Sequence, residues 1–152
     1  MIQKKQEPLV SIIVNCFNGE RFLRQALDSI LSQTYQNWEV IFWDNQSTDK
    51  SAEIYKSYNE KRFKYFYSPK HTLVAEARNL AIDKSTGEFI AFLDVDDWWL
   101  PSKLEQQIPL FTDSTVGIVC GNYYILYEQK NKTVKALKGS IPTGNVLKSL
   151  LN

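Results

Sequence analysis

One stretch of this chain constrains its fold more than any other. An apolar run at residues 89–93 is followed at once by the acidic segment Asp94-Val95-Asp96-Asp97. An uninterrupted apolar run of this length is typical of a strand buried on both faces of a parallel sheet. Carboxylates directly after such a strand lie at its carboxyl end, where open parallel sheets bind ligands. Alternating carboxylates there can hold a hard divalent cation, and the cation can hold a diphosphate.

Similar apolar runs recur along the chain and alternate with segments of helical periodicity. We expect strands at residues 10–15, 40–43, 63–67, 89–93 and 116–120. We expect helices at residues 22–31, 48–58, 74–84 and 101–108. This alternation predicts an α/β fold in which helices flank a mostly parallel central sheet in three layers.

The ends of these elements carry their own signals. Ser47 or Thr48 can cap the second helix, and Gly87 fits the C-terminal stop of the third. Residues 123–137 predict a hairpin that turns near Asn131. Residues 143–152 look like the opening of a helix, so we expect a chain that is truncated or covered there by a partner.

Composition narrows the class of protein. The 152 residues suffice for one domain, and the net charge of +1 gives no electrostatic case for nucleic acid. The first eight residues are no signal peptide and no apolar run could span a bilayer, so we expect a cytoplasmic protein. Cys16 and Cys120 both lie in apolar runs, which favours two reduced, buried thiols over a disulfide.

Missing motifs exclude several kinds of site. The sequence has no Gly-x-x-x-x-Gly-Lys phosphate loop and no Gly-x-Gly-x-x-Gly fingerprint, which argues against kinase-type and dinucleotide sites. It has no Gly-x-Ser-x-Gly elbow and a single histidine, so a hydrolase triad is implausible. That histidine, His71, lies in a loop without further metal ligands, and we expect it to be exposed and without a role.

Three strand ends would converge if the sheet is parallel. Asn15, Phe17 and Asn18 follow the first strand, Asp44 follows the second, and Asp94 and Asp96 follow the fourth. A nucleotide needs a flat apolar face for its base, a carboxylate or amide for its ribose, and a cation for its phosphates. These residues supply all three in one place, which favours a nucleotide site.

Structural explanations compete with this one. Asp44 could simply shape a turn before the next helix, and Asp96 with Asp97 could be charges that favour a helix N-terminus. Arg78, on the expected third helix, could pair with the acidic segment or a phosphate, or could lie along the surface. Three acids within four residues repel one another unless a positive charge neutralises them, which argues for a site.

At this point the chain resembles the nucleotide-binding half of a family 2 glycosyltransferase with the GT-A fold, a Rossmann-like α/β/α architecture. Four segments carry the resemblance in the family's order, over roughly residues 8–120. They are residues 10–18 (VSIIVNCFN), 40–49 (VIFWDNQSTD), 75–81 (AEARNLA) and 87–97 (GEFIAFLDVDD). Residues 1–152 would then be a single nucleotide-sugar-binding domain, truncated before the acceptor-binding part.

The resemblance implies a role for each candidate residue. Asn15, Phe17, Asn18 and Asp44 would hold the base and ribose of a nucleotide-sugar. Asp94 and Asp96 would be the metal-binding D-x-D pair for Mn²⁺ or Mg²⁺, with Asp94 also facing the nucleotide-sugar and Arg78 organising that edge. The sequence departs from the family where Asn15-Cys16 replaces Pro-Thr and where Asp44-Asn45-Gln46 replaces Asp-Asp-Gly. The catalytic base is expected beyond the C-terminus.

The function implied is transfer of a sugar, with inversion, from a nucleotide-diphospho-sugar to an acceptor hydroxyl with help from a metal. A UDP-sugar is the expected donor, and a carbohydrate or lipid-linked acceptor, as in bacterial polysaccharide biosynthesis, is the expected partner. Association with the inner face of the membrane and homodimer formation are left open. The alternatives are a non-catalytic or truncated module that binds a nucleotide-sugar and a nucleotidyltransferase.

Overall fold

The structure is a computed structural model that describes residues 7–139 and Gly144. The chain divides into two compact units, residues 1–106 and residues 107–152, and each is described by itself. The expected helix at residues 143–152 lies outside the described residues apart from Gly144. In the described part, no helix combines the length and the apolar character needed to cross a membrane.

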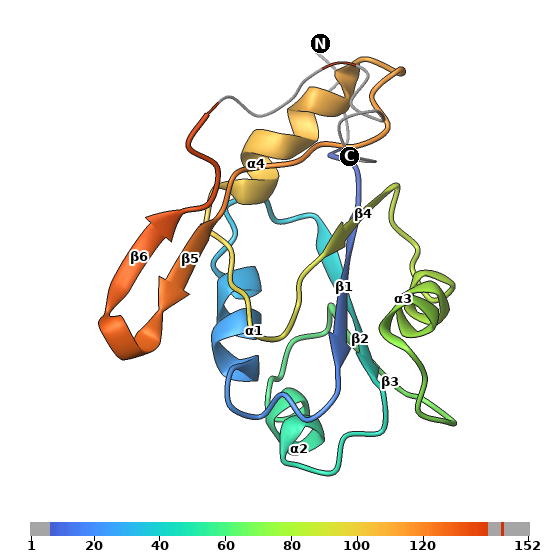
Figure 1. The fold of residues 1–152 in the computed structure, drawn as a ribbon. Coiled ribbons are helices and arrows are strands. Elements are labelled where there is room, and N and C mark those ends of the chain that lie inside the picture. The colour runs from blue at the N-terminus through green and yellow to red at the C-terminus, as the bar shows by residue number, and fades with distance from the viewer. Residues whose placement is uncertain (1–6, 140–143, 145–152) are drawn as a thin grey trace. The chain divides into compact units, whose positions relative to one another are not determined.

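The first unit is built on a sheet of four parallel strands (Figure 1). The strands are β1 (Val10–Cys16), β2 (Trp38–Asp44), β3 (Phe63–Tyr67) and β4 (Phe89–Phe92), in the spatial order β3-β2-β1-β4. All seven residues of β2 are buried, as are six of the seven in β1. The prediction of a mostly parallel sheet is confirmed. The expectation that the strand before the acidic segment is buried on both faces is wrong, because Ile90 and Phe92 of β4 are exposed.

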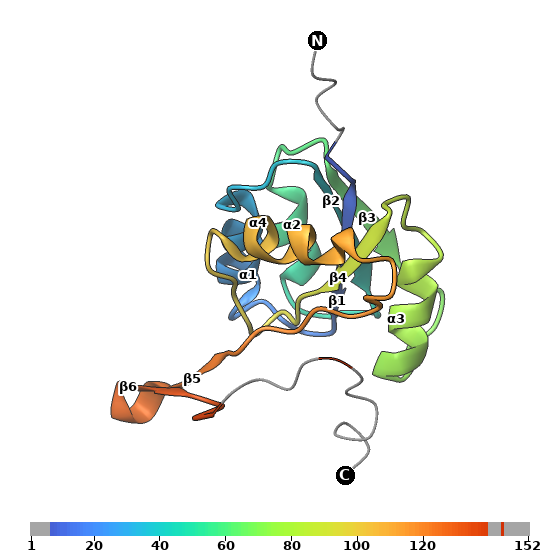
Figure 2. The same cartoon turned by 90° about the horizontal axis from the view of Figure 1, so that it is seen from above.

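Helices cover both faces of this sheet. Helices α1 (Leu23–Leu31) and α2 (Ser51–Lys56) lie on one face, and α3 (Val74–Ile82) lies on the other (Figures 1 and 2). Ala77 and Ala81 of α3 pack on Ile13, Ile41 and Trp43. Because alanine side chains are short, α3 lies close against β1 and β2. The three-layer α/β/α prediction is confirmed.

The loop after the first unit's last strand docks on the end of α1. The amide of Gln33 donates to the carbonyl of Leu100 at 2.8 Å, and its side-chain oxygen accepts from the N–H of Leu104 at 3.1 Å. Gln33 and Leu104 are both only 1% exposed, so the bond between them is shielded from water. The two hydrogen bonds anchor the start of α4 (Lys103–Gln107), the helix expected in this region.

Two expected helix ends are wrong. Helix α2 begins at Ser51, and the carboxylate of Asp49, rather than Ser47 or Thr48, accepts the Ser51 N–H at 2.9 Å. Helix α3 ends at Ile82, well before Gly87. Gly87 instead packs against β1, where its N–H donates to the Ser11 hydroxyl at 2.8 Å.

The second unit contains a short antiparallel hairpin. Strands β5 (Tyr124–Tyr127) and β6 (Lys132–Lys135) are joined by the 3₁₀ turn η2 (Glu128–Lys130), and another 3₁₀ helix, η1 (Ile108–Thr112), precedes them. Asn131 has a φ of +43°, a left-handed conformation that asparagine tolerates in turns. The hairpin prediction and its turn near Asn131 are confirmed.

The strand expected at residues 116–120 is absent: the segment is irregular and pairs with no strand in the described part. Ile118 is 69% exposed, so the apolar run lacks the cover on both faces that a buried parallel strand needs. Both cysteines are free thiols, as expected. Cys16 is buried, but Cys120 is exposed, which corrects the expectation of two buried thiols.

A buried carboxylate holds the amino end of the sheet together. Glu39 of β2 is 4% exposed, and its Oε1 accepts hydrogen bonds from the Ser11 hydroxyl at 2.6 Å and the Thr86 N–H at 2.8 Å. Its other oxygen pairs with the ammonium group of Lys64. Burial would raise the pKa of Glu39, but the hydrogen bonds from Lys64, Ser11 and Thr86 outweigh it and lower the pKa.

We expect Glu39→Gln to lower the free energy of unfolding by about 1–3 kcal/mol, because buried donors lose a charged acceptor. The wild-type contribution should be present at neutral pH and should fade as pH drops from 4.5, the ordinary value, toward the lowered native pKa. Urea denaturation between pH 3 and pH 7 measures both effects. Glu88→Gln, at an exposed position, is the matched control, and an equal loss in both variants would contradict the assignment.

We expect Gly87→Ala to destabilise the protein by about 1–3 kcal/mol through overpacking. An added Cβ would lie 2.7 Å from both the carbonyl oxygen of Leu9 and the backbone nitrogen of Ser11, and neither can move without disturbing β1. Gly117→Ala is the control, since a Cβ there meets nothing within 4 Å. Similar denaturation midpoints for the two variants would show that the close approach is unimportant.

Candidate functional site

The carboxyl ends of β1, β2 and β4 meet at one edge of the first unit. In the parallel register Cys16 pairs with Asp44, and the Asn45 N–H donates to the carbonyl of Cys16 at 2.8 Å. A Cβ on Gly19 would lie 3.0 Å from the Val95 side chain, so the loop after β1 touches the acidic loop after β4. The structure therefore brings all three predicted strand ends together.

Asp44 lies at the base of this edge and is completely buried. Its Oδ1 accepts from the Ser47 N–H at 2.7 Å, and its Oδ2 accepts from the Tyr65 hydroxyl at 2.6 Å. Burial and the adjacent Asp44 carboxylate raise the pKa of Tyr65, which keeps the phenol protonated as a donor. In this arrangement Asp44 shapes the loop after β2, and its contact with a nucleotide stays a prediction.

Asn18 ties the loop after β1 to the loop after β2. Its φ of +54° turns the chain, and its Oδ1 accepts from the Thr48 N–H at 2.8 Å. The Asn18 N–H in turn donates to the Ser47 hydroxyl at 3.1 Å. Because the amide oxygen is engaged, Asn18 positions this rim, and a direct contact with ligand stays a prediction.

A reciprocal pair of carboxylates extends the same connection. The Glu20 N–H donates to Asp49 Oδ2 at 2.9 Å, and the Lys50 N–H donates to Glu20 Oε2 at 2.9 Å. The pKa of Asp49 is lowered, because hydrogen bonds from Ser51 and Glu20 outweigh the effect of its burial. These bonds hold the two loops in a fixed relation next to the start of α2.

Phe17 offers a flat apolar surface beside the rim. Its side chain is 52% exposed, and its ring centroid lies 4.3 Å from that of His71 with the rings tilted by 55°. His71 is held in turn by Nδ1, which lies 2.9 Å from the carbonyl oxygen of Asn45. The expectation that His71 has no role missed this contact, and no spacing signal in the sequence links the two rings.

Asn45 connects the rim to the segment before α3. Its amide nitrogen donates to the carbonyl of Thr72 at 2.8 Å, and its amide oxygen accepts from the Thr72 N–H at 3.1 Å. Both residues are buried. The position of the polar residue Asn45 directly after a buried strand was the available sequence signal for a role at this edge.

Asn15 lies on β1 opposite Trp43 of β2. Both atoms of its side-chain amide are buried and make no hydrogen bond in the structure. An unpaired buried polar group costs about 1–3 kcal/mol, so such groups call for a ligand, a water or a strained role. Its predicted contact with a nucleotide-sugar fits this unmet hydrogen-bonding capacity.

The acidic loop is open to solvent at the same edge. Asp94, Asp96 and Asp97 are exposed, and Arg78 Nη2 forms an ion pair with Asp94 Oδ1 at 2.6 Å. Partial burial raises the pKa of Asp97, and the neighbouring charges of Asp96 and Asp94 raise it further. Of the two interpretations of Arg78, the structure shows the pairing with the acidic segment.

The donor set at this loop suits a hard divalent cation. Asp94 and Asp96 offer carboxylate oxygens, and a metal that also binds substrate phosphates needs only one or two of these. Burial is the main cause of the raised pKa of Asp97, and repulsion by Asp96 and Asp94 adds to it; a cation would relieve that repulsion. Among the described residues no three acidic, histidine or cysteine side chains are grouped as a ready metal site, and Asp94 is already paired with Arg78.

Solved structures of glycosyltransferases share the fold. The chain matches the Staphylococcus aureus TarS 1-349 complex with UDP-GlcNAc with a TM-score of 0.61 and 29% identity, over 64% of this chain and 29% of that one. It matches the mannosyltransferase PcManGT of Pyrobaculum calidifontis, in complex with GDP-Man and Mn²⁺, with a TM-score of 0.67 and 26% identity. This match covers 74% of this chain and 35% of that one. The class of protein defined by the sheet and its edge is therefore a GT-A-type glycosyltransferase.

Sequence comparison gives the family. The model of glycosyl transferase family 2 matches residues 11–149, so this chain belongs to that family. An uncharacterized glycosyltransferase of Haemophilus influenzae is 42% identical over 118 residues. The Escherichia coli UDP-Glc:alpha-D-GlcNAc-diphosphoundecaprenol beta-1,3-glucosyltransferase WfgD is 37% identical over 118 residues. The matches cover 76% and 78% of this chain but 47% of each relative, so the chain spans about half of their length.

We expect Asp44→Ala to lower the free energy of unfolding by about 1–3 kcal/mol, because it leaves the Ser47 N–H and Tyr65 hydroxyl without their buried acceptor. Asp96→Ala should change it by no more than about 0.5 kcal/mol, as is usual for exposed sites. Thermal and urea unfolding of the ligand-free protein compares the two. Equal stability of both variants would contradict a structural role for Asp44.

Proposed function

We propose that this protein is an inverting glycosyltransferase, and that this chain binds a nucleoside-diphosphate sugar at the carboxyl edge of its sheet. The observation that carries the proposal is the position of the acidic loop. Val95 packs against Gly19, so Asp94 and Asp96 lie beside the loop that presents Phe17. Carboxylates for a cation that binds a diphosphate and a flat surface for a base are therefore available at one edge.

Each part of the donor has a counterpart at this edge. The exposed ring of Phe17 offers stacking for the base, and the unpaired amide of Asn15 offers hydrogen bonds to base or ribose. Asp44 and Asn18 fix the loops around that space. The neighbouring structures carry UDP-GlcNAc and GDP-Man, and WfgD is named for UDP-Glc, which supports a nucleotide-sugar donor and favours UDP.

Asp94 and Asp96 would hold a Mn²⁺ or Mg²⁺ ion at the diphosphate, with Arg78 keeping the Asp94 carboxylate in place. The ion would supply positive charge for the departing nucleoside diphosphate. In the proposed reaction the acceptor oxygen forms a bond to the anomeric carbon as the bond from that carbon to the diphosphate oxygen breaks. A carboxylate base takes the proton of the acceptor hydroxyl.

The acceptor side of the proposal comes from relatives. WfgD is named for transfer to a GlcNAc that is linked to diphosphoundecaprenol. We extend this to the present protein and propose that its acceptor is a lipid-linked saccharide. The transfer would take place at the surface of a membrane during assembly of a polysaccharide. The expected cytoplasmic location belongs to the same proposal.

We expect UDP to bind the chain in the presence of Mn²⁺ and to lose this metal-dependent binding in Asp96→Ala, since the variant removes an exposed carboxylate from the acidic loop. Isothermal titration calorimetry with and without Mn²⁺ measures it. Glu88→Ala is the matched control, because Glu88 is an exposed acid that directly precedes β4, whereas Asp96 follows it.

Two results would contradict the proposal. Failure of folded wild-type protein to bind UDP in the presence of Mn²⁺ would contradict the proposed donor site. Unchanged binding by folded Asp96→Ala would show that the acidic loop is not where the diphosphate and cation bind. Circular dichroism on the same samples establishes that each variant is folded.

A further inference from the structure

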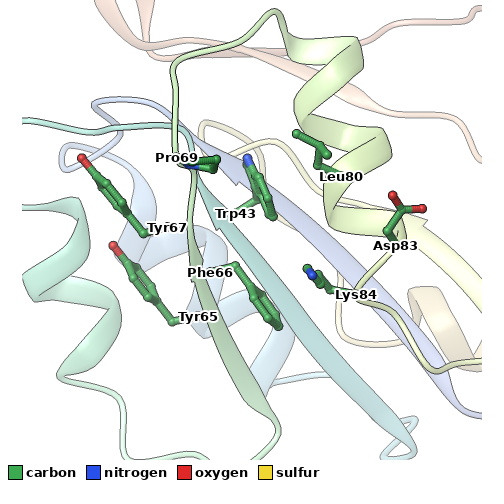
Figure 3. A pocket seen from close by; sticks show the side chains of 8 residues that line it. All are labelled: Trp43, Tyr65, Phe66, Tyr67, Pro69, Leu80, Asp83 and Lys84. Carbon is green, nitrogen blue, oxygen red and sulfur yellow. The ribbon is translucent and has the colours of Figure 1, made fainter.

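A cavity lies along the outer edge of β3 (Figure 3). Its volume is about 480 Å³, within the range of small-ligand sites. Its lining is dominated by aromatic and aliphatic side chains with two charged residues: Trp43, Tyr65, Phe66, Tyr67, Pro69, Leu80, Asp83 and Lys84. None of these residues belongs to the acidic loop or to the loop after β1.

One residue that lines this β3-edge cavity carries an unused hydrogen-bond donor. Trp43 is 5% exposed, and its Nε1 is buried without a partner in the structure. The indole lines the cavity, and Figure 3 shows its nitrogen at the end of the ring toward Pro69. A buried N–H without an acceptor is costly, so the cavity is suited to a ligand that presents an acceptor oxygen there.

The walls of the cavity are apolar and its rim is polar. Phe66 stacks on Trp43 with ring centroids 6.5 Å apart, and Tyr67 is 56% exposed. At the rim Lys84 Nζ lies 5.9 Å from the Phe66 ring centroid, and Asp83 is exposed where α3 ends. The cavity thus combines flat apolar surfaces with a neutral donor, a carboxylate acceptor and an ammonium donor.

These features select among ligands. The charges of Asp83 and Lys84 offset each other at the rim, so no net positive charge favours a phosphorylated ligand. A purely apolar ring would leave the Trp43 N–H unpaired. An uncharged saccharide ring has C–H faces that can lie on aromatic rings, and its hydroxyl groups both donate and accept. We propose that the β3-edge cavity is a saccharide-binding site, separate from the nucleotide-sugar site, in which Trp43 Nε1 donates to a sugar oxygen and Asp83 accepts from a hydroxyl.

The indole N–H signal of Trp43 tests this location directly. In ¹⁵N-labelled protein it is assigned through Trp43→Phe, and cellobiose is the probe, with cyclohexanol as an apolar ring carrying one hydroxyl. We expect cellobiose to shift the Trp43 signal saturably and to leave that of Trp38 unchanged, because Trp38 is buried and does not line the cavity. A response to cyclohexanol equal to that of cellobiose would overturn the assignment to saccharides.

Affinities from ligand-observed NMR complete the test. Loss of one neutral hydrogen bond should weaken cellobiose binding by about two- to tenfold in Trp43→Phe. Loss of a hydrogen bond to a charged acceptor should weaken it by about ten- to a hundredfold in Asp83→Ala. Glu53→Ala, an exposed acid on α2, is the control and should bind like wild type. No saturable shift of Trp43 with cellobiose, or unaltered affinity in both cavity variants, would overturn the proposal.

The outcome is independent of the proposed donor site. Asp96→Ala should bind cellobiose like wild type, since Asp96 does not line the cavity. UDP with Mn²⁺ should leave the cellobiose affinity unchanged if the two sites are separate. Competition between UDP with Mn²⁺ and cellobiose would show that the sugar occupies the carboxyl edge, which would overturn a separate site.

Discussion

The parallel pairing of β1 with β2 on one side and β4 on the other is the constraint on which the site depends. Because all three strands run in one direction, their carboxyl ends must finish at the same edge. Two features then join the ends: the Asn45 N–H bond to the carbonyl of Cys16, and the contact of Gly19 with Val95. The buried Glu39 fixes the opposite end of the sheet through Ser11, Lys64 and Thr86.

The polar and aromatic residues at the carboxyl edge fall into two groups: some hold the loops in place, and others are available to contact a ligand. The side-chain oxygens of Asp44, Asn18 and Asn45 accept hydrogen bonds from backbone N–H groups or hydroxyls of neighbouring segments. Phe17 and Asp96 stay exposed, and the side-chain amide of Asn15 is buried without a partner. A site with a rigid frame and a few unsatisfied groups needs little rearrangement to hold a ligand, which favours affinity.

The sequence predicted the sheet well because β1 and β2 are buried on both faces and so consist mostly of apolar residues. The strand predicted at residues 116–120 is wrong, because this apolar run is not packed between other elements in the described structure. Gly87 was wrongly assigned to a helix stop. Its real constraint is the close approach to Leu9 and Ser11, which lie far away in the sequence, so no local pattern could show it. The burial of Asp44 depends on Tyr65, and the position of His71 depends on Phe17, so neither could be inferred from local pattern. The roles assigned to the candidate nucleotide and metal residues stay predictions.

The central claim is that a metal-bound diphosphate lies at the carboxyl ends of β1, β2 and β4. Paramagnetic broadening by Mn²⁺ in the presence of UDP locates that ion directly in an NMR spectrum of the backbone amides. The account predicts selective loss of signals from residues 94–97 and from the loops at residues 17–19 and 45–47. Broadening centred instead on Glu39 and Thr86, at the amino ends of the strands, would contradict it.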